Sequence, residues 1–145
     1  MATVEERFSH ALHNTARGWR QAIDRRLKDL GMSQASWLTV AVAAKSTAPL
    51  SQTELAHRVG VEGATMVAML DRLARAGLLE RLPSATDRRV KLVRLTPQGT
   101  QLYAKVRTEA DAVRRKFLAG VDTAQLQAAT ELLEALQQVA DEEAR

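Results

Sequence analysis

The stretch from Leu50 to Thr96 constrains the fold more than any other part of the chain, because its pattern is two short helices followed by a hairpin. Ser51 and Glu54 have the S-x-x-E spacing of a capping box, in which the hydroxyl and the carboxylate accept hydrogen bonds from backbone amides at a helix start. Gly60 is the residue type that most often follows the end of such a helix. We therefore expect the first helix to lie between Ser51 and Gly60.

A second helix is expected from Ala64 to Ala76, with Gly77 closing it. Helical spacing predicts that one face packs inward, and we assign to that face Met66, Val67, Leu70, Leu73 and Ala74. The outward face is then predicted to carry Thr65, Ala68, Met69 and Arg72. Small side chains with one hydroxyl and one arginine fit a DNA major groove, where threonine can hydrogen-bond and arginine can bind guanine or phosphate. The alternative is an ordinary solvent-facing helix surface.

Residues 78–82 and 90–95 interleave apolar and polar side chains, which predicts two strands with one face buried. The basic, turn-rich residues 83–89 then form the loop of a hairpin. At the tip of a projecting hairpin, Arg89 can enter the narrow minor groove and respond to its width. Asp87 would repel phosphate, but its carboxylate can orient an arginine as a bidentate partner. Together these patterns predict a mainly α fold containing a winged helix-turn-helix with a small β-hairpin wing.

These residues resemble the MarR family of bacterial transcription regulators, and in particular its SlyA-like branch. The similarity covers nearly the whole chain and lies in short stretches, which are Trp19-Arg20, Asp24, Arg26-Leu27, Gln34-Ala35-Ser36-Trp37, Leu70-Asp71-Arg72-Leu73, Gly77-Leu78-Leu79, Asp87-Arg88-Arg89 and Leu95-Thr96-Pro97-Gln98-Gly99. The resemblance implies a homodimer whose two winged regions contact successive turns of a pseudo-palindromic operator in double-stranded DNA.

The resemblance also implies one MarR-type domain over residues 1–145, with the DNA-binding region at 33–96 and helical dimerisation regions at 1–32 and 97–145. Arg89 is expected in the minor groove, held by Asp87. Ala68 departs from the SlyA pattern, which often has a basic residue there, so the base sequence that is read is expected to differ. The full set of predicted DNA-binding residues is Ala64, Thr65, Ala68, Arg72, Asp87, Arg88 and Arg89.

The segments on either side predict four further helices. A capping box at Thr3 opens a helix expected to last to about Leu30, and Ser33 can cap a helix over 34–45. Thr96 can cap a helix that begins at Pro97 and ends near Gly120, and Asp122 can cap the last one. The first and last helices carry apolar stripes that could form a dimer interface. The alternative is that these stripes pack within one subunit.

Composition limits the possible functions. The 145 residues include no cysteine, which excludes disulfides, thiolate metal sites and a catalytic thiol. No long apolar run or secretory signal is visible, so we expect a cytoplasmic protein without a membrane span. The net charge of +4 is modest, but residues 50–96 carry eight Lys or Arg against five Asp or Glu, whereas residues 119–145 carry one against six. This distribution predicts phosphate contacts and salt-dependent affinity in the central stretch.

Other candidate sites are weaker. His10 and His13 are one helical turn apart, but two histidines alone make a poor metal site, so no metal or cofactor is expected. No catalytic motif is present, and we expect no enzyme activity. Many members of the resembled family bind small aromatic carboxylates, for which we propose Arg17 or Arg20 as the cation and Trp37 as the flat surface. The alternative for Trp37 is a place in the core.

The sequence therefore predicts a sequence-specific DNA-binding regulator of transcription, acting as a repressor and released by a small aromatic carboxylate. Two other functions fit the same features. One is an architectural DNA binder with little sequence preference. The other is a winged-helix module that contacts only proteins. The ratio of specific to nonspecific DNA affinity, and its salt dependence, would distinguish these three functions.

Overall fold

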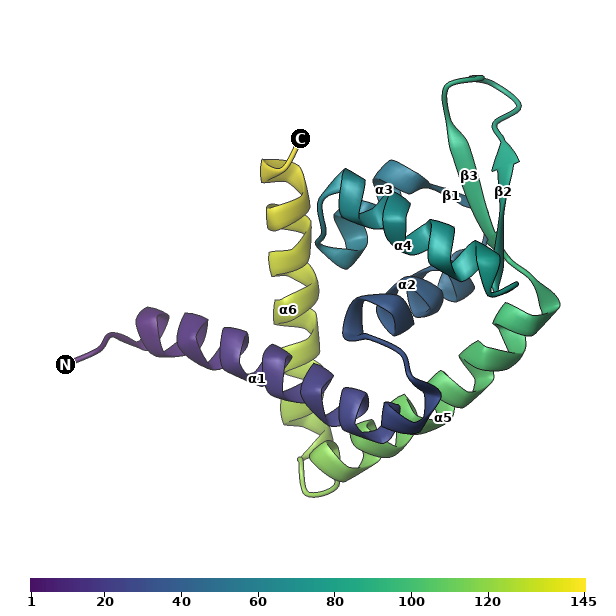
Figure 1. Cartoon of the computed structure of the whole chain (residues 1–145). Coiled ribbons are helices and arrows are strands. Elements are labelled where there is room, and N and C mark those ends of the chain that lie inside the picture. Colours follow the sequence, from purple (N-terminus) through teal and green to yellow (C-terminus); the bar gives the residue numbers. More distant parts are fainter. The chain divides into compact units, whose positions relative to one another are not determined.

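The computed structural model describes residues 1–145, which form a mainly helical protein with one small sheet (Figure 1). Its elements in chain order are α1 (Val4–Arg26), the 3-10 helix η1 (Lys28–Leu30), α2 (Gln34–Lys45), β1 (Leu50–Ser51), α3 (Gln52–Val59), α4 (Gly63–Arg75), β2 (Leu79–Pro83), β3 (Lys91–Leu95), α5 (Pro97–Leu118) and α6 (Thr123–Glu143). This order confirms the predicted succession of helix, helix and hairpin in the central stretch. No helix combines the length and apolar character needed to cross a membrane.

Helices α1, α2 and α6 begin where the sequence supplies a side-chain cap. The Thr3 hydroxyl accepts from the amide of Glu6 at 3.1 Å, and the Glu6 carboxylate accepts from the amide of Thr3 at 2.7 Å. Ser33 and Asp122 accept in the same way from amides in the first turns of α2 and α6. These bonds satisfy donors that the first helical turn leaves unpaired. The predicted starts of the three helices are confirmed.

The helix-turn-helix of α3 and α4 forms at the predicted place. The Ser51 hydroxyl accepts from the amide of Glu54 at 3.1 Å, but it also donates to the Glu54 carboxylate, so only half of the predicted capping box is present. Gly60 and Gly77 have φ values of 83° and 77°, the left-handed conformation that favours glycine. One ends α3, and the other turns the chain from α4 into β2.

The first helix ends earlier than predicted. It stops at Arg26 rather than near Leu30, and the last residues tighten into η1. The amide of Leu30 donates to the carbonyl of Leu27 at 2.9 Å, and the amide of Gly31 donates to that of Lys28 at 3.1 Å. Hydrogen bonds between residues three positions apart are common at helix ends. Apolar spacing alone cannot reveal this change, because the buried Leu27 keeps the stripe continuous.

The sheet has three strands rather than the two of the predicted hairpin. The strands β2 and β3 form that hairpin, with Leu79 opposite Leu95. The short strand β1 pairs antiparallel with the other edge of β3, which makes β3 the central strand. We did not predict β1 because it has two residues, too few to show alternation, and one of them, Ser51, also caps α3.

Two groups of buried side chains form the core of residues 1–113. The first joins α2, α3, α4 and the sheet through Val40, Leu50, Leu55, Ala56, Met66, Met69, Leu70, Leu73, Leu79 and Val93. The second joins α1, α2 and α5 through Ala22, Ile23, Leu27, Trp37, Val106 and Val113. Because α2 contributes Val40 to one group and Trp37 to the other, it connects the helix-turn-helix and the sheet to α1 and α5.

The chain divides into two compact units, residues 1–113 and 114–145. The second unit contains the end of α5 and all of α6, in which no residue is buried. Four large apolar side chains of α6 are exposed, namely Leu132, Leu133, Leu136 and Val139. An exposed apolar patch of this kind is typical of a surface that contacts another chain.

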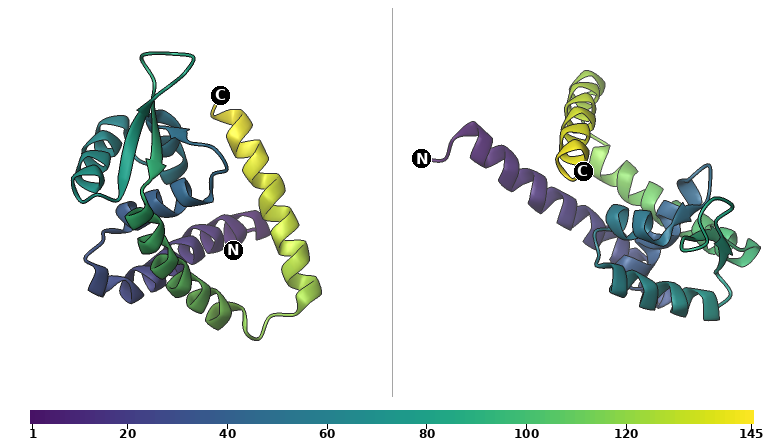
Figure 2. Two further views of the ribbon diagram at one scale, coloured as in Figure 1. Left: turned by 90° about the vertical axis from the view of Figure 1, so that its right-hand side faces the viewer. Right: turned by 90° about the horizontal axis from the view of Figure 1, so that it is seen from above.

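The start of α5 lies very close to the turn that follows α4 (Figure 2). The amide of Thr96 donates to the carbonyl of Leu78 at 3.1 Å, and its hydroxyl donates to the carbonyl of Gly77 at 2.6 Å. Gly99 lies in the first turn of α5, and a Cβ atom there would collide with the same Leu78 oxygen. This junction therefore has no room for a side chain at residue 99.

We predict that Gly99→Ala lowers the free energy of unfolding by about 2–3 kcal/mol, because the added methyl group must displace backbone rather than a flexible side chain. Gly18→Ala is the matched control. Nothing lies within 4 Å of a Cβ atom at Gly18, and in the interior of α1 alanine should stabilise by up to about 1 kcal/mol. Urea unfolding followed by circular dichroism measures both. A Gly99→Ala variant as stable as the parent would contradict the close approach.

Candidate nucleic-acid interface

Helix α4 presents an exposed face built from short side chains and arginines. Thr65, Ala68 and Arg72 are exposed as predicted, and Arg75 continues the same face one turn further. A shallow groove of about 640 Å³ runs along this face and is lined by Ala64, Thr65, Ala68, Asp71, Arg72 and Arg75. Because two of the lining residues are alanines, the helix backbone can closely approach a surface such as the edges of DNA bases at those positions.

Two other side chains of α4 lie on the opposite side from the one predicted. Met69, predicted to face outward, is 2% exposed, and Val67, predicted to face inward, is 41% exposed. The buried stripe is Met66, Met69, Leu70 and Leu73, which follows the i, i+3, i+4, i+7 spacing of a packed helix. The Sδ atom of Met69 accepts from the buried Thr39 hydroxyl at 3.1 Å, which ties α4 to α2. The predicted DNA-facing residues are unaffected by this correction.

Arg81 of β2 joins the hairpin to both helices of the helix-turn-helix. Its Nε donates to the Gln52 side chain at the start of α3 at 2.7 Å. Its Nη2 donates to the carbonyl of Val67 at 3.2 Å and pairs with the Asp71 carboxylate of α4 at 2.7 Å. The Arg81 side chain is only 25% exposed, so these bonds are screened less than those of a surface ion pair. They orient the hairpin relative to α4.

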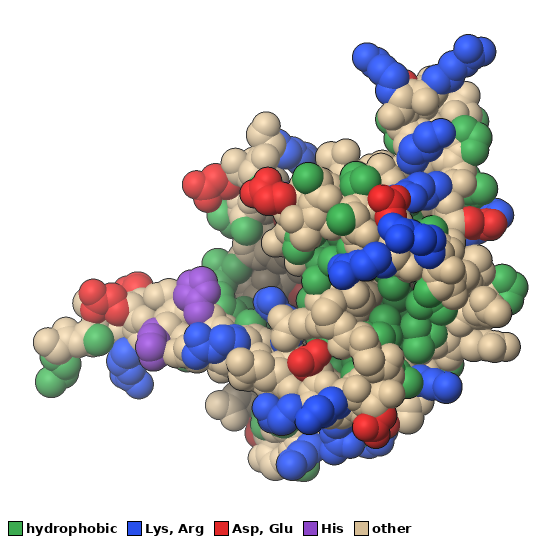
Figure 3. All heavy atoms as spheres, in the orientation of Figure 1, with side chains coloured by type: hydrophobic (Ala, Val, Ile, Leu, Met, Phe, Trp, Pro, Cys, Tyr) green, Lys and Arg blue, Asp and Glu red, His purple; other side chains and the backbone are tan.

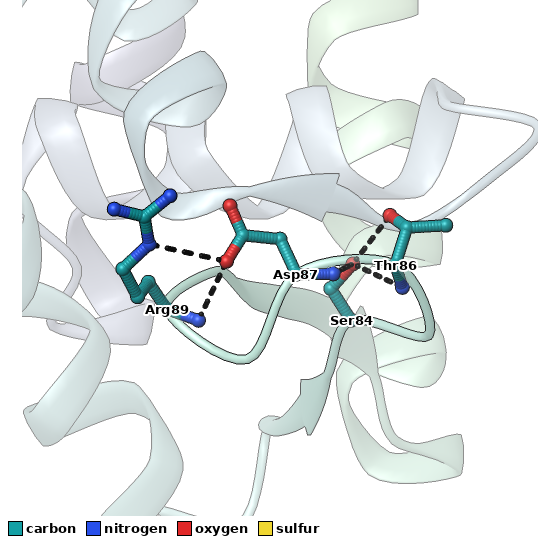
Figure 4. Close-up of polar contacts among 4 residues, drawn as sticks. All are labelled: Ser84, Thr86, Asp87 and Arg89. Carbon is teal, nitrogen blue, oxygen red and sulfur yellow. Dashed lines mark hydrogen bonds and ion pairs between the residues drawn. The ribbon is translucent and has the colours of Figure 1, made fainter.

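The hairpin of β2 and β3 projects from the helices (Figures 1 and 2), and Arg88 and Arg89 lie in the loop at its tip. One oxygen of Asp87 accepts from the Arg89 amide at 2.9 Å and lies 3.4 Å from the Arg89 Nε (Figure 4). Asp87 therefore contacts the backbone amide and the Nε atom of Arg89, and does not form the predicted bidentate pair with its guanidinium. The Arg89 side chain is 91% exposed, and both of its Nη groups remain available to another molecule.

Basic side chains gather over the tip of the hairpin and along the exposed face of α4 (Figure 3). Arg72, Arg75 and Arg88 form no ion pair within the chain. The acidic side chains of this region are partly engaged with other arginines, as Asp71 is with Arg81. Three unpaired positive charges thus lie on the two surfaces predicted to contact DNA, where they can neutralise phosphates.

The residues predicted to bind an aromatic carboxylate differ in their exposure to solvent. Arg17 and Arg20 are exposed on α1, and Arg17 donates to the Asn14 side chain at 2.7 Å. Trp37 is 3% exposed, and its indole N–H donates to the Asp24 carboxylate at 3.2 Å. The groove along α4 and a second one beside α5, of about 770 Å³, are lined by other residues.

His10 belongs to a short polar network on α1 with Asn14 and Arg17. The His10 Nε2 lies 2.8 Å from the Asn14 side-chain nitrogen, and His57 is exposed in the last turn of α3. No group of three or more His, Cys, Asp or Glu side chains is close enough to hold a metal ion.

Sequence reasoning missed Arg75 and Arg81. Arg75 follows Arg72 by three residues, so the helical spacing that identified the outward face could have included it. Arg81 could not have been identified in this way, because its contacts span 14 residues to Val67 and 29 to Gln52. Nothing local to β2 indicates that this arginine turns toward the helices rather than toward solvent.

Comparison with known proteins connects this chain to regulators of transcription. A model of the MarR family matches residues 42–91. The chain is 40% identical to the transcriptional regulator PA3341, with 95% of this chain and 99% of that one covered and a TM-score of 0.85. NadR in complex with 4-hydroxyphenylacetate shares the fold at 20% identity, with 94% and 93% covered and a TM-score of 0.81. The S. aureus MepR–DNA complex does so at 18% identity, with 96% and 99% covered and a TM-score of 0.76.

We predict that Arg81→Met lowers the free energy of unfolding by about 1–2 kcal/mol, because the apolar stem is kept but three acceptors lose their donor. Arg94→Met is the control. It removes the same charge, yet Arg94 pairs only with Glu80 on the neighbouring strand and is 55% exposed, so a loss below about 0.5 kcal/mol is expected. Thermal unfolding measures both variants. Equal losses would show that Arg81 does not join the hairpin to the helices.

Proposed function

Because this chain belongs to the MarR family of transcription regulators, we propose that it binds a pseudo-palindromic operator as a homodimer and represses transcription. The observation that carries the proposal is the pairing of two exposed, basic surfaces, the outward face of α4 and the tip of the hairpin. A dimer bound at a promoter would exclude RNA polymerase from the same DNA. The motifs at residues 70–73, 77–79, 87–89 and 95–99 favour the SlyA-like branch of the family, to which we propose that the chain belongs.

In the proposed complex α4 lies in the major groove. Thr65 would hydrogen-bond to a base edge, and Arg72 would bind guanine or phosphate. Ala64 and Ala68 would allow the helix to approach the bases, since neither has a side chain beyond Cβ. Arg75, which forms no ion pair within the chain, would contact phosphate. The exposure of all these residues on one face supports this arrangement.

The tip of the hairpin would contact the adjacent minor groove. Arg89 is the proposed contact, since its guanidinium can enter a narrow groove of high negative potential. Asp87 would limit the directions that the Arg89 side chain can take through its contacts with the amide and with Nε. Arg88 is exposed beside it and would neutralise a backbone phosphate.

The proposed homodimer would form through the helices outside the winged region, residues 1–32 and 97–145. Exposed apolar side chains near the start of α1, Val4, Phe8 and Leu12, and the exposed leucines of α6 support this assignment. Two copies of the DNA-binding region, at 33–96, would then contact half-sites one DNA turn apart. The MepR–DNA complex supports the general mode of binding.

We also propose that a small aromatic carboxylate releases the protein from DNA. The complex of NadR with 4-hydroxyphenylacetate supports this ligand class. Arg17 or Arg20, both exposed on α1, would pair with the carboxylate. Trp37 would stack on the aromatic ring only after a local rearrangement, because its ring lies in the core.

The test of the DNA-binding proposal is a footprint on the upstream region of the protein's own gene, with affinities at several salt concentrations. We expect two protected half-sites about 10 base pairs apart and a protein mass of two chains. Arg89→Ala should weaken operator binding by about 1–3 kcal/mol without changing the unfolding midpoint, since the side chain is exposed. Arg25→Ala, which removes an exposed arginine of α1, is the charge control and should bind like the parent.

Other outcomes of that experiment identify the alternative functions. Equal affinity for operator and scrambled duplex would indicate an architectural DNA binder. Absent DNA binding at low salt would indicate a module that contacts proteins. Equal operator affinity of Arg89→Ala and the parent in matched salt would contradict the role of the wing while leaving the role of α4 open to its own test with Arg72→Ala.

For the ligand, we predict that millimolar salicylate or 4-hydroxyphenylacetate raises the unfolding midpoint and weakens operator binding. A variant with both Arg17→Ala and Arg20→Ala should need a higher concentration for the same effect, because the carboxylate loses its cation. Phenol is the matched control, since it keeps the ring and lacks the carboxylate. No change in either measurement with the acids would exclude this ligand class.

A further inference from the structure

The loop at the tip of the hairpin is organised by the hydroxyl of Ser84. Its Oγ accepts from the amides of Thr86 and Asp87 at 3.3 Å each, and it lies 3.2 Å from the Thr86 hydroxyl (Figure 4). Two backbone bonds close the loop, from the Ser84 amide to the Val90 carbonyl at 3.2 Å and from the Val90 amide to the Asp87 carbonyl at 3.1 Å. One side chain thus fixes the backbone at Asp87.

The fixed backbone of Asp87 in turn restricts the position of Arg89. Once its backbone is fixed, its carboxylate accepts from the Arg89 amide at 2.9 Å and contacts the Arg89 Nε at 3.4 Å. Ser84, Asp87 and Arg89 therefore form a chain of contacts that ends at the exposed guanidinium. All of these contacts lie within residues 84–90, so the order at the tip does not depend on packing against the rest of the protein.

The hydrogen bonds of Ser84 favour a role within the loop rather than on DNA. A hydroxyl has one proton and two acceptor sites. The amides of Thr86 and Asp87 both donate to the Ser84 Oγ, and the Thr86 hydroxyl lies 3.2 Å from the same atom. All three contacts of the Ser84 hydroxyl are therefore with residues of the loop.

We propose that Ser84 is a positioning residue for DNA binding, which holds Asp87 so that Arg89 is presented to the minor groove in a restricted set of directions. This proposal rests on the proposed contact of Arg89. A long arginine side chain on a mobile loop loses conformational freedom when it binds, and that loss weakens affinity. Ordering the loop in the free protein reduces this loss of conformational entropy on binding, and so increases the affinity for DNA.

The test uses Ser84→Ala and a conservative variant, Ser84→Asn, whose amide oxygen can accept from the same two amides as in an Asx turn. We expect Ser84→Ala to weaken operator binding about fivefold, with an unchanged unfolding midpoint and faster hydrogen exchange of the Thr86 and Asp87 amides. Ser84→Asn should restore affinity to within about twofold of the parent, because it restores the acceptor. A purely structural role would lower the unfolding midpoint instead.

A double-mutant cycle with Arg89→Ala separates positioning from direct contact. If Ser84 acts through Arg89, Ser84→Ala should have no further effect on operator affinity in the Arg89→Ala background. A full additive loss there would overturn the proposal, because it would mean that Ser84 acts on DNA independently. Parent-like affinity of Ser84→Ala, with Arg89→Ala weakened, would overturn the proposal and leave the proposed function standing. Parent-like affinity of Arg89→Ala would overturn both the wing contact and the role of Ser84.

Discussion

The proposed DNA-binding surface depends on the contacts of one partly buried guanidinium, that of Arg81. Its three acceptors belong to α3 and α4, while the arginine itself belongs to β2. Apart from the turn that joins them, helix α4 and the hairpin otherwise meet through apolar packing, which is not directional. Hydrogen bonds to a planar guanidinium have fixed directions, so they set the angle between the two surfaces. A molecule that must place a helix and a hairpin in neighbouring grooves needs that angle to be constant.

The hairpin is held at its base and at its tip by separate sets of contacts. At the base, β3 is the central strand between β1 and β2, and Thr96 and Gly99 join its end to the turn after α4. At the tip, Ser84 and Asp87 bond only within the loop. Between these ends the two strands pair regularly. The hairpin is therefore held in place by hydrogen bonds along its whole length.

Much of the fold could be predicted because its signals are local. Caps such as Thr3 and Asp122 act within one helical turn, and the residues that supply them can be identified directly in the sequence. The outward positions of Thr65 and Arg72 followed from helical spacing. The strand β1 was missed because its partner, β3, is some forty residues away, and Met69 was misplaced because a methionine suits either face. The contacts of Arg81 were invisible for the same long-range reason.

The self-contained tip of the wing also affects how proteins of this architecture can diverge. Substitutions between Ser84 and Val90 meet few side chains outside the loop, so their effects should seldom spread to the two groups of core residues. A lineage could change what its wing reads on DNA while the core sequence stayed constant. The base of the hairpin would keep its structure while the sequence of the loop changed. New regulatory targets could then arise without an intermediate that fails to fold.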